Sequence, residues 1–156
     1  MDKKDLEKAF SSALRYRSHR PRTSFEIKNF LLKKFFSEDV INKVITKFIS
    51  NKMIDDKEFA RMFSVDAVSL KQLSKKVLLN KLLQKGIEKN LAVDTIASIY
   101  KTIDENILIQ KVIDKKFKMK KIKDLNDLQK QKLFQFLLRR GFLSEDISKV
   151  LKINFE

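Results

Sequence analysis

The side chains of this sequence that could do chemistry are almost all cationic, and they gather in three sets. The first set is four arginines within eight residues, with no acid among them: Arg15, Arg17, Arg20 and Arg22. Arginine binds carboxylate and phosphate groups through a planar fork of donors, so this set predicts contact with an anion or an acidic surface. A solvated charge run between two helices explains the pattern equally well.

The second set recurs near the ends of predicted helices and comprises Lys33, Lys34, Lys85, Arg139 and Arg140. Cations in a last helical turn stabilise the helix dipole, which accounts for the set without any function. A periodic array of positive charge also suits a helical polyanion or a filament, and we favour both roles together.

The third set belongs to a run of six lysines within residues 115–123. Lysine binds phosphate as a point charge, so the run predicts non-specific electrostatic binding and not base recognition. The alternative is a helix end and linker whose apolar residues dock on the core. The candidate contacts in this run are Lys115, Lys116, Lys118, Lys120 and Lys121.

The residues that most catalytic and cofactor sites need are scarce. The 156 residues include no cysteine, one histidine (His19), two glycines and one proline. This composition excludes disulfides, thiolate and multi-histidine metal sites, and glycine-rich phosphate loops. We therefore predict a protein that is not an enzyme and that has no metal and no cofactor.

The net charge of +15 and the hydropathy pattern bear on partners and location. A strongly basic chain favours nucleic acid, an anionic membrane or an acidic protein as its partner. No apolar run reaches the length of a membrane span, and no signal-peptide core follows the first residues. We expect a cytoplasmic protein that does not bind membranes.

The elements that must position these cations form an internal repeat. Residues 23–49 align without a gap on residues 74–100, and at an offset of 106 they align on the end of the chain. The only two glycines, Gly86 and Gly141, then share one position, which Phe35 occupies in the first copy. Each copy reads as a helix, a tight turn and a helix, with glycine suited to a left-handed residue after the first helix. With Phe35 in that place, the first turn is either different or mildly strained.

Local signals set the bounds of these helices. Thr23 and Glu26 have the spacing of a capping box, which marks a helix start. A third helix follows each of the first two copies, at about residues 55–70 and 104–117, and a further helix at about 3–17 precedes them. The phenylalanines of the turns and helices are expected in the core: Phe35, Phe36, Phe63 and Phe142.

The predicted fold class is therefore all-α. We expect an elongated tandem array of three three-helix, helix-turn-helix-like repeats, the last one truncated, plus an N-terminal helix. The predicted divisions are 1–22 for the N-terminal helix and basic connector, 23–72 for repeat 1, 73–122 for repeat 2 and 123–156 for repeat 3.

Four motifs on this repeat resemble those of bacterial RecX proteins. The first is Arg20-Pro21-Arg22-Thr23 with Glu26-Ile27 and Lys34-Phe35-Phe36, and the second is Met53-Ile54-Asp55-Asp56-Lys57-Glu58-Phe59-Ala60. The later two are Leu82-Leu83-Gln84-Lys85-Gly86-Ile87, and Gln131-Lys132-Leu133 with Leu138-Arg139-Arg140-Gly141-Phe142. The resemblance covers residues 13–151. Two features depart from the family pattern: Lys71 is the only basic residue of 62–73, where a basic stretch is usual, and the first turn lacks glycine.

The resemblance implies a regulator of homologous recombination, DNA repair and the SOS response. RecX proteins bind the RecA recombinase, so it implies that this chain binds RecA filaments on DNA and inhibits RecA ATPase and strand exchange. The fourteen cations of the three sets are then candidate contacts to RecA or DNA. We expect a monomer, and weak non-specific DNA binding is left open.

The alternative function is a non-specific nucleic-acid-binding helical protein that acts directly on DNA. The net charge and the helix pairs favour it. The second helices of the pairs, such as residues 41–49, are largely apolar and offer few side chains for reading bases. A sequence-specific DNA reader is therefore not expected.

Overall fold

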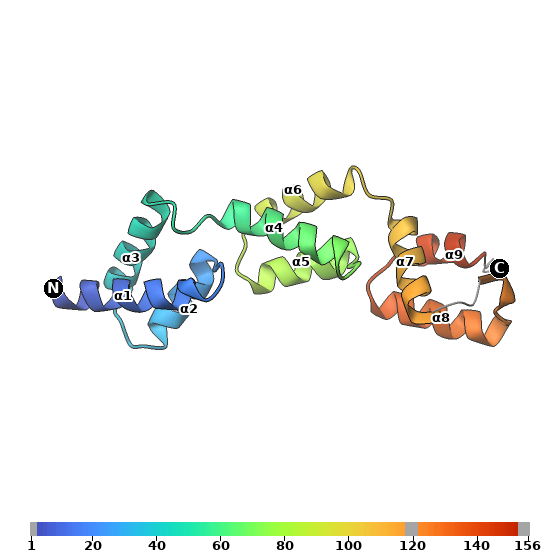
Figure 1. Cartoon of the computed structure of the whole chain (residues 1–156), viewed down its shortest axis with the longest axis horizontal. Helices are drawn as coiled ribbons and strands as arrows, with labels where there is room; N and C mark the ends of the chain where they lie inside the picture. The colour runs from blue at the N-terminus through green and yellow to red at the C-terminus, as the bar shows by residue number, and fades with distance from the viewer. Residues whose placement is uncertain (1–2, 118–121, 153–156) are drawn as a thin grey trace. The chain divides into compact units, whose positions relative to one another are not determined.

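The computed structural model describes residues 3–117 and 122–152 of the chain. Within these residues all regular structure is helical, which confirms the predicted all-α fold class (Figure 1). The first helices are α1 (Lys3–Ser18), α2 (Ser24–Leu32), α3 (Glu38–Ser50), α4 (Asp56–Ser69) and α5 (Lys75–Gln84). They are followed by α6 (Lys89–Tyr100), α7 (Glu105–Phe117), the short 3-10 helix η1 (Ile122–Asp124), α8 (Asp127–Arg139) and α9 (Ser144–Leu151).

The chain divides into two compact units. The first comprises the residues up to Met62 together with Leu82–Ala92, and the second comprises Phe63–Lys81 together with the residues from Val93 onward. Helices α4, α5 and α6 therefore each contribute to both units. The expected division of the chain at residues 22, 72 and 122 stays a prediction.

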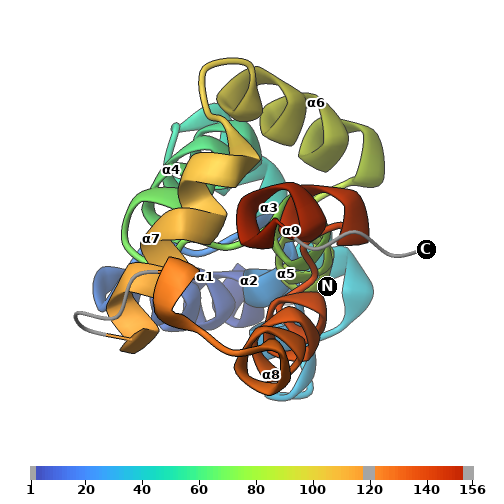
Figure 2. The ribbon, with the colours of Figure 1, turned by 90° about the vertical axis from the view of Figure 1, so that its right-hand side faces the viewer.

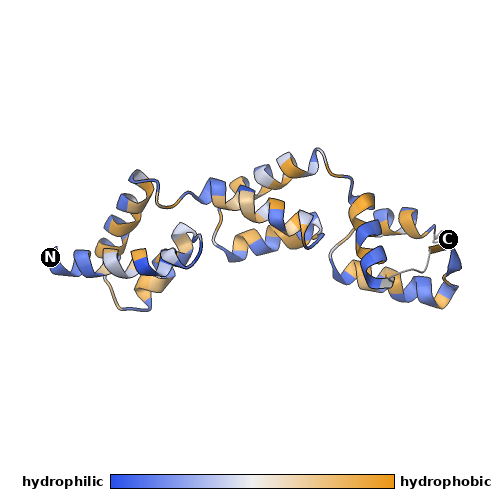
Figure 3. Cartoon of the chain, in the orientation of Figure 1, coloured by the Kyte–Doolittle hydropathy of each residue, from blue (hydrophilic) through white to orange (hydrophobic). Residues whose placement is uncertain are grey.

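The core of the first unit lies among α1, α2 and α3, which pack on one another. Each helix turns an apolar stripe inward and a polar face outward, as the alternating hydropathy in Figure 3 shows. The rings of Phe10 and Phe48 stack at a centroid distance of 5.0 Å where α1 meets α3. The buried residues of this core are Ala9, Ala13, Ile27, Leu31, Val40, Ile41, Val44, Phe48 and Ile54.

In the second unit, α9 packs against both α7 and α8. Figure 2 shows α7 and α9 side by side. In each group the helix–turn–helix pair is completed by the helix that comes before it in the chain. Helix α1 precedes the pair α2–α3, and α7 precedes the pair α8–α9. The core of this group is built from Leu108, Ile109, Val112, Ile113, Leu125, Leu133, Phe134, Leu137, Phe142, Ile147 and Leu151.

The predicted equivalence of Phe35, Gly86 and Gly141 is confirmed in the backbone. Their φ angles are 61°, 76° and 81°, all in the left-handed region. In each turn the following N–H reaches back five residues to a carbonyl, with N···O distances of 3.3, 3.1 and 3.3 Å. This is the Schellman turn that ends a helix. The first turn thus has the same shape as the others, with a phenylalanine in the strained position.

Besides their positive φ, the two glycines lie too close to neighbouring residues to leave room for a side chain. A Cβ on Gly86 would lie 2.1 Å from the Cβ of Phe25, and one on Gly141 would lie 2.7 Å from Ser74 Oγ. At the same places Thr23 Oγ1 donates to the Lys85 carbonyl at 2.7 Å, and Ser74 Oγ donates to the Arg140 carbonyl at 2.9 Å. One repeated junction therefore joins the start of a first helix to the turn of the following copy.

Candidate functional site

Glu26 gathers three of the predicted contact residues around one carboxylate. Arg20 binds it through two donors, with Nη2 2.6 Å from Oε1 and Nη1 3.1 Å from Oε2. Lys85 Nζ donates to Oε1 at 3.1 Å, and Arg22 Nη1 lies 3.9 Å from the same oxygen. Burial opposes the charge on Glu26, but hydrogen bonds from Arg20, Lys85 and the Thr23 N–H outweigh it and lower the Glu26 pKa to about 2.

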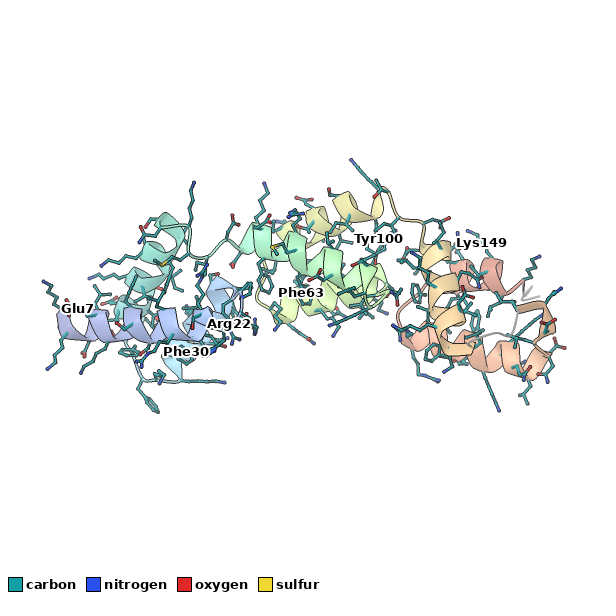
Figure 4. The ribbon with its side chains drawn as sticks, viewed as in Figure 1. Glu7, Arg22, Phe30, Phe63, Tyr100 and Lys149 are labelled. Carbon is teal, nitrogen blue, oxygen red and sulfur yellow. The ribbon has the colours of Figure 1, made fainter. Side chains whose placement is uncertain are left out.

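Arg22 is also held by aromatic rings. Its guanidinium lies 3.9 Å from the ring centroid of Tyr16, and that ring stacks on Phe30 at 4.1 Å. Figure 4 shows Arg22 and Phe30 near one another in this part of the fold. The Arg22 side chain is 13% exposed. Arg20, Arg22 and Lys85 therefore bind an internal carboxylate, which is a structural use of charges that sequence patterns assign to a partner.

The two aspartates of the motif at residues 53–60 also hold the fold. Asp55 Oδ1 accepts the N–H of Glu58 at 2.9 Å, so Asp55 caps the start of α4. Asp56 accepts the N–H of Ser24 at 2.8 Å and the Ser24 hydroxyl. The motif thus ties the start of α4 to the start of α2.

A basic groove lies between α1 and the turn after α2, and it brings together three predicted residues: Arg15, Lys33 and Lys34. It is an open groove with a volume of about 710 Å³. Lys4 and Lys8 of α1 add two more cations, and Glu7 is the only carboxylate residue among those lining it. We call this surface, lined by Lys4, Lys8, Arg15, Lys33, Lys34 and Phe35, the α1–α2 basic groove.

Phe35 stands at the edge of this groove and is 96% exposed, so the prediction that it lies in the core is wrong. Phe142 is buried as predicted, whereas Phe36 and Phe63 are half-buried. Lys4 and Lys8 were not among the residues predicted to contact a partner. Their spacing to Arg15 was the available signal, because residues 4, 8 and 15 fall on one face of a helix.

Two candidate cations of the second unit, Lys116 and Arg140, contact the ring of Phe136. Lys116 Nζ lies 3.6 Å from the ring centroid and the Arg140 guanidinium 5.7 Å from it. Arg140 Nη2 also donates to the Lys71 carbonyl at 3.1 Å. Arg139 and Lys115 are exposed, as is Arg15 in the first unit, while Arg17 is half-buried. The candidates Lys118, Lys120 and Lys121 lie outside the described residues.

The described residues, 3–117 and 122–152, hold neither a candidate metal cluster nor a membrane-spanning helix. No cluster of three or more histidine, cysteine or acidic side chains that could hold a metal occurs in them. No helix among them is long and apolar enough to cross a membrane.

Comparison with known proteins assigns the family. The model of the first three-helix domain of RecX matches residues 9–48, and that of the third three-helix domain matches residues 104–151. The regulatory protein RecX of Finegoldia magna is 34% identical over 141 residues, which make up 90% of this chain and 68% of that protein. The chain belongs to the RecX family. The two matched domains coincide with the helix groups α1–α3 and α7–α9.

Other RecX proteins are longer. Those of Oceanobacillus iheyensis and Bacillus cytotoxicus are each 28% identical over 97% and 94% of this chain. The chain covers 56% and 53% of them, so it spans about half their length. The crystal structure of RecX from Lactobacillus salivarius has a TM-score of 0.77 at 25% identity over 96% of both chains. A second RecX crystal structure, at 21% identity, shares the fold with a TM-score of 0.76 over 95% of this chain and 71% of that one.

Proposed function

We propose that this RecX protein regulates homologous recombination and DNA repair by binding RecA filaments on DNA and inhibiting RecA ATPase and strand exchange. The observation that carries the proposal is family membership along most of the chain, since the similar proteins are named regulatory proteins. The protein acts in the cytoplasm, as a monomer, on a filament that is a protein–DNA complex.

The distribution of charge supports a binding role. Fifteen net positive charges on 156 residues favour an anionic partner such as a nucleoprotein filament. We assign partner contact to the exposed candidates that bind neither Glu26 nor Phe136. They are Arg15, Lys33 and Lys34 in the α1–α2 basic groove, together with Arg139 and Lys115; Lys34 Nζ also lies 5.3 Å from the centroid of the Phe30 ring.

The experiment that tests this function is a titration of the single-stranded-DNA-dependent ATPase of RecA with the full chain. We expect inhibition well below one protein per RecA monomer, and at salt concentrations where the protein alone no longer binds DNA. Inhibition that appears only when the protein saturates the DNA would instead indicate competition for the strand. An unaffected ATPase at every ratio would refute the proposal.

Variants separate partner contact from folding. The Arg139→Glu substitution reverses an exposed charge, so we expect weaker inhibition with an unchanged melting temperature. Arg140→Glu is not a suitable variant, because Arg140 also holds the Lys71 carbonyl and should therefore affect stability. Lys101→Glu, an exposed lysine outside all three cationic sets, is the matched control and should inhibit like the parent protein.

A further inference from the structure

Phe35 combines two unfavourable features at one position. Its φ of 61° is a conformation that costs a residue with a Cβ about 1–2 kcal/mol, and the equivalent positions carry glycine. Its side chain is 96% exposed, so the ring gains almost nothing from burial in return. Lys52, Gln72 and Lys152 also have a positive φ, so what sets Phe35 apart is a large aromatic ring held there in solvent, and this points to a role outside the fold of the chain.

The surroundings of Phe35 are cationic along an extended path. Lys33 and Lys34 precede it, and Lys4, Lys8 and Arg15 follow one face of α1. At 1.5 Å per residue, the path from Lys4 to Arg15 along α1 is about 16 Å. Figure 4 shows Glu7, the one carboxylate residue that lines the groove, on the same helix.

We propose that the α1–α2 basic groove binds a segment of single-stranded nucleic acid. The phosphates lie along the lysines and Arg15, and one unpaired base stacks on the exposed ring of Phe35. A nucleotide satisfies both features at once, because it carries a phosphate and a flat base on neighbouring atoms of one unit. Charged grooves with aromatic platforms bind single strands in this way, whereas the bases of a duplex are already stacked. The proposal concerns the free strand and does not depend on the action on RecA.

The absence of tryptophan from the chain allows a test at this position alone. In Phe35→Trp the only indole stands on the groove edge, and stacking of a base should quench its fluorescence. The probe is an oligothymidylate of about 16 nucleotides, within the site sizes of known single-strand-binding folds. The matched control is Leu143→Trp, which places an indole at another exposed apolar position, 61% exposed, on the second unit. We expect quenching in the first variant and little in the control.

Two more variants divide stacking from charge. Phe35→Ala should weaken binding of the labelled oligonucleotide by roughly 5- to 150-fold, the range for loss of one aromatic platform, with an unchanged salt dependence. A plot of log affinity against log salt concentration has a negative slope. The double variant Lys33→Ala/Lys34→Ala should make that slope less steep by about 1.4, measured between about 50 and 200 mM salt. The control Lys101→Ala/Lys111→Ala removes the same net charge from exposed positions outside the groove and should change the steepness of the salt dependence less.

Several results would overturn the proposal. Equal quenching of Phe35→Trp and Leu143→Trp would show diffuse binding with no defined site. Unchanged oligonucleotide affinity in Phe35→Ala would remove the stacking platform. A duplex bound as tightly as the single strand, with equal quenching, would exclude an unpaired base. Polyglutamate that competes as strongly as an oligonucleotide of the same charge would assign the groove to an acidic protein segment.

Discussion

Replacing Phe35 by glycine should stabilise this protein, although it deletes a large aromatic side chain. The left-handed φ of 61° disfavours any residue with a Cβ by about 1–2 kcal/mol, and glycine removes that penalty. Glycine also raises the entropy of the unfolded chain, which offsets about 0.5–1 kcal/mol of the gain. The ring is 96% exposed, so its loss takes away little buried area. We expect a net stabilisation of about 0.5–1 kcal/mol.

Urea denaturation followed by circular dichroism measures this change, and the melting temperature should rise by about 1–4 °C. Phe35→Ala is the matched control. It removes the same ring but keeps a Cβ in the left-handed position, so it should gain no stability. The difference between the glycine and alanine variants isolates the backbone strain. If Phe35→Gly is no more stable than Phe35→Ala, the turn is not strained in solution and Phe35 carries no backbone strain for a role outside the fold to explain.

Three further predictions concern the junctions and the buried charge. Gly86→Ala should destabilise the protein by about 2–5 kcal/mol in urea denaturation, because it adds left-handed strain and a Cβ 2.1 Å from Phe25; a loss below about 1 kcal/mol would contradict the close approach. Thr23→Val should cost about 1–2 kcal/mol, since Thr23 both caps α2 and donates to the Lys85 carbonyl, whereas Thr23→Ser should restore most of it. The Glu26 pKa is about 2 in the folded chain against the ordinary 4.5, so the stability that its charge contributes is complete above pH 4.5 and is lost as the pH falls towards 2. Glu26→Gln should be less stable than the parent at pH 7 by about 1–2 kcal/mol, allowing for screening by solvent around the partly exposed Arg20, and the gap should narrow over that acid range; a constant gap would contradict the low pKa.

Features set by residues close together in the sequence could be predicted, whereas contacts between distant residues could not. The capping box at Thr23 and Glu26 and the glycine turns at Gly86 and Gly141 were predicted and are confirmed, because each is set by residues within a few positions. The cationic partners of Glu26 were not predicted. Lys85, which is 59 residues away, reaches Glu26 only because the repeated junction brings the turn of the second copy to the start of the first.

The exposure of Phe35 could not be predicted from the sequence either. Burial tendencies favour a core position for phenylalanine, and the repeat aligns it with glycines that do meet a neighbouring helix start. Whether a turn is covered depends on packing between elements, which no local pattern encodes. The α1–α2 basic groove was missed for that reason, since its cations come from α1 and from the turn after α2, and only three of the five were among the candidates.

By itself, the sequence determined the all-helical class, the order of the helices, the three equivalent turns and the excess of positive charge, because helical periodicity, capping and composition act locally or by simple addition. Only the tertiary structure decided which cations bind groups within the fold and which stay exposed. Arg20, Arg22 and Lys85 meet the Glu26 carboxylate, while Lys33 and Lys34 stand beside an exposed ring. The physical reason is that a charge is neutralised by what lies within a few ångströms in space, and that neighbourhood is set by packing.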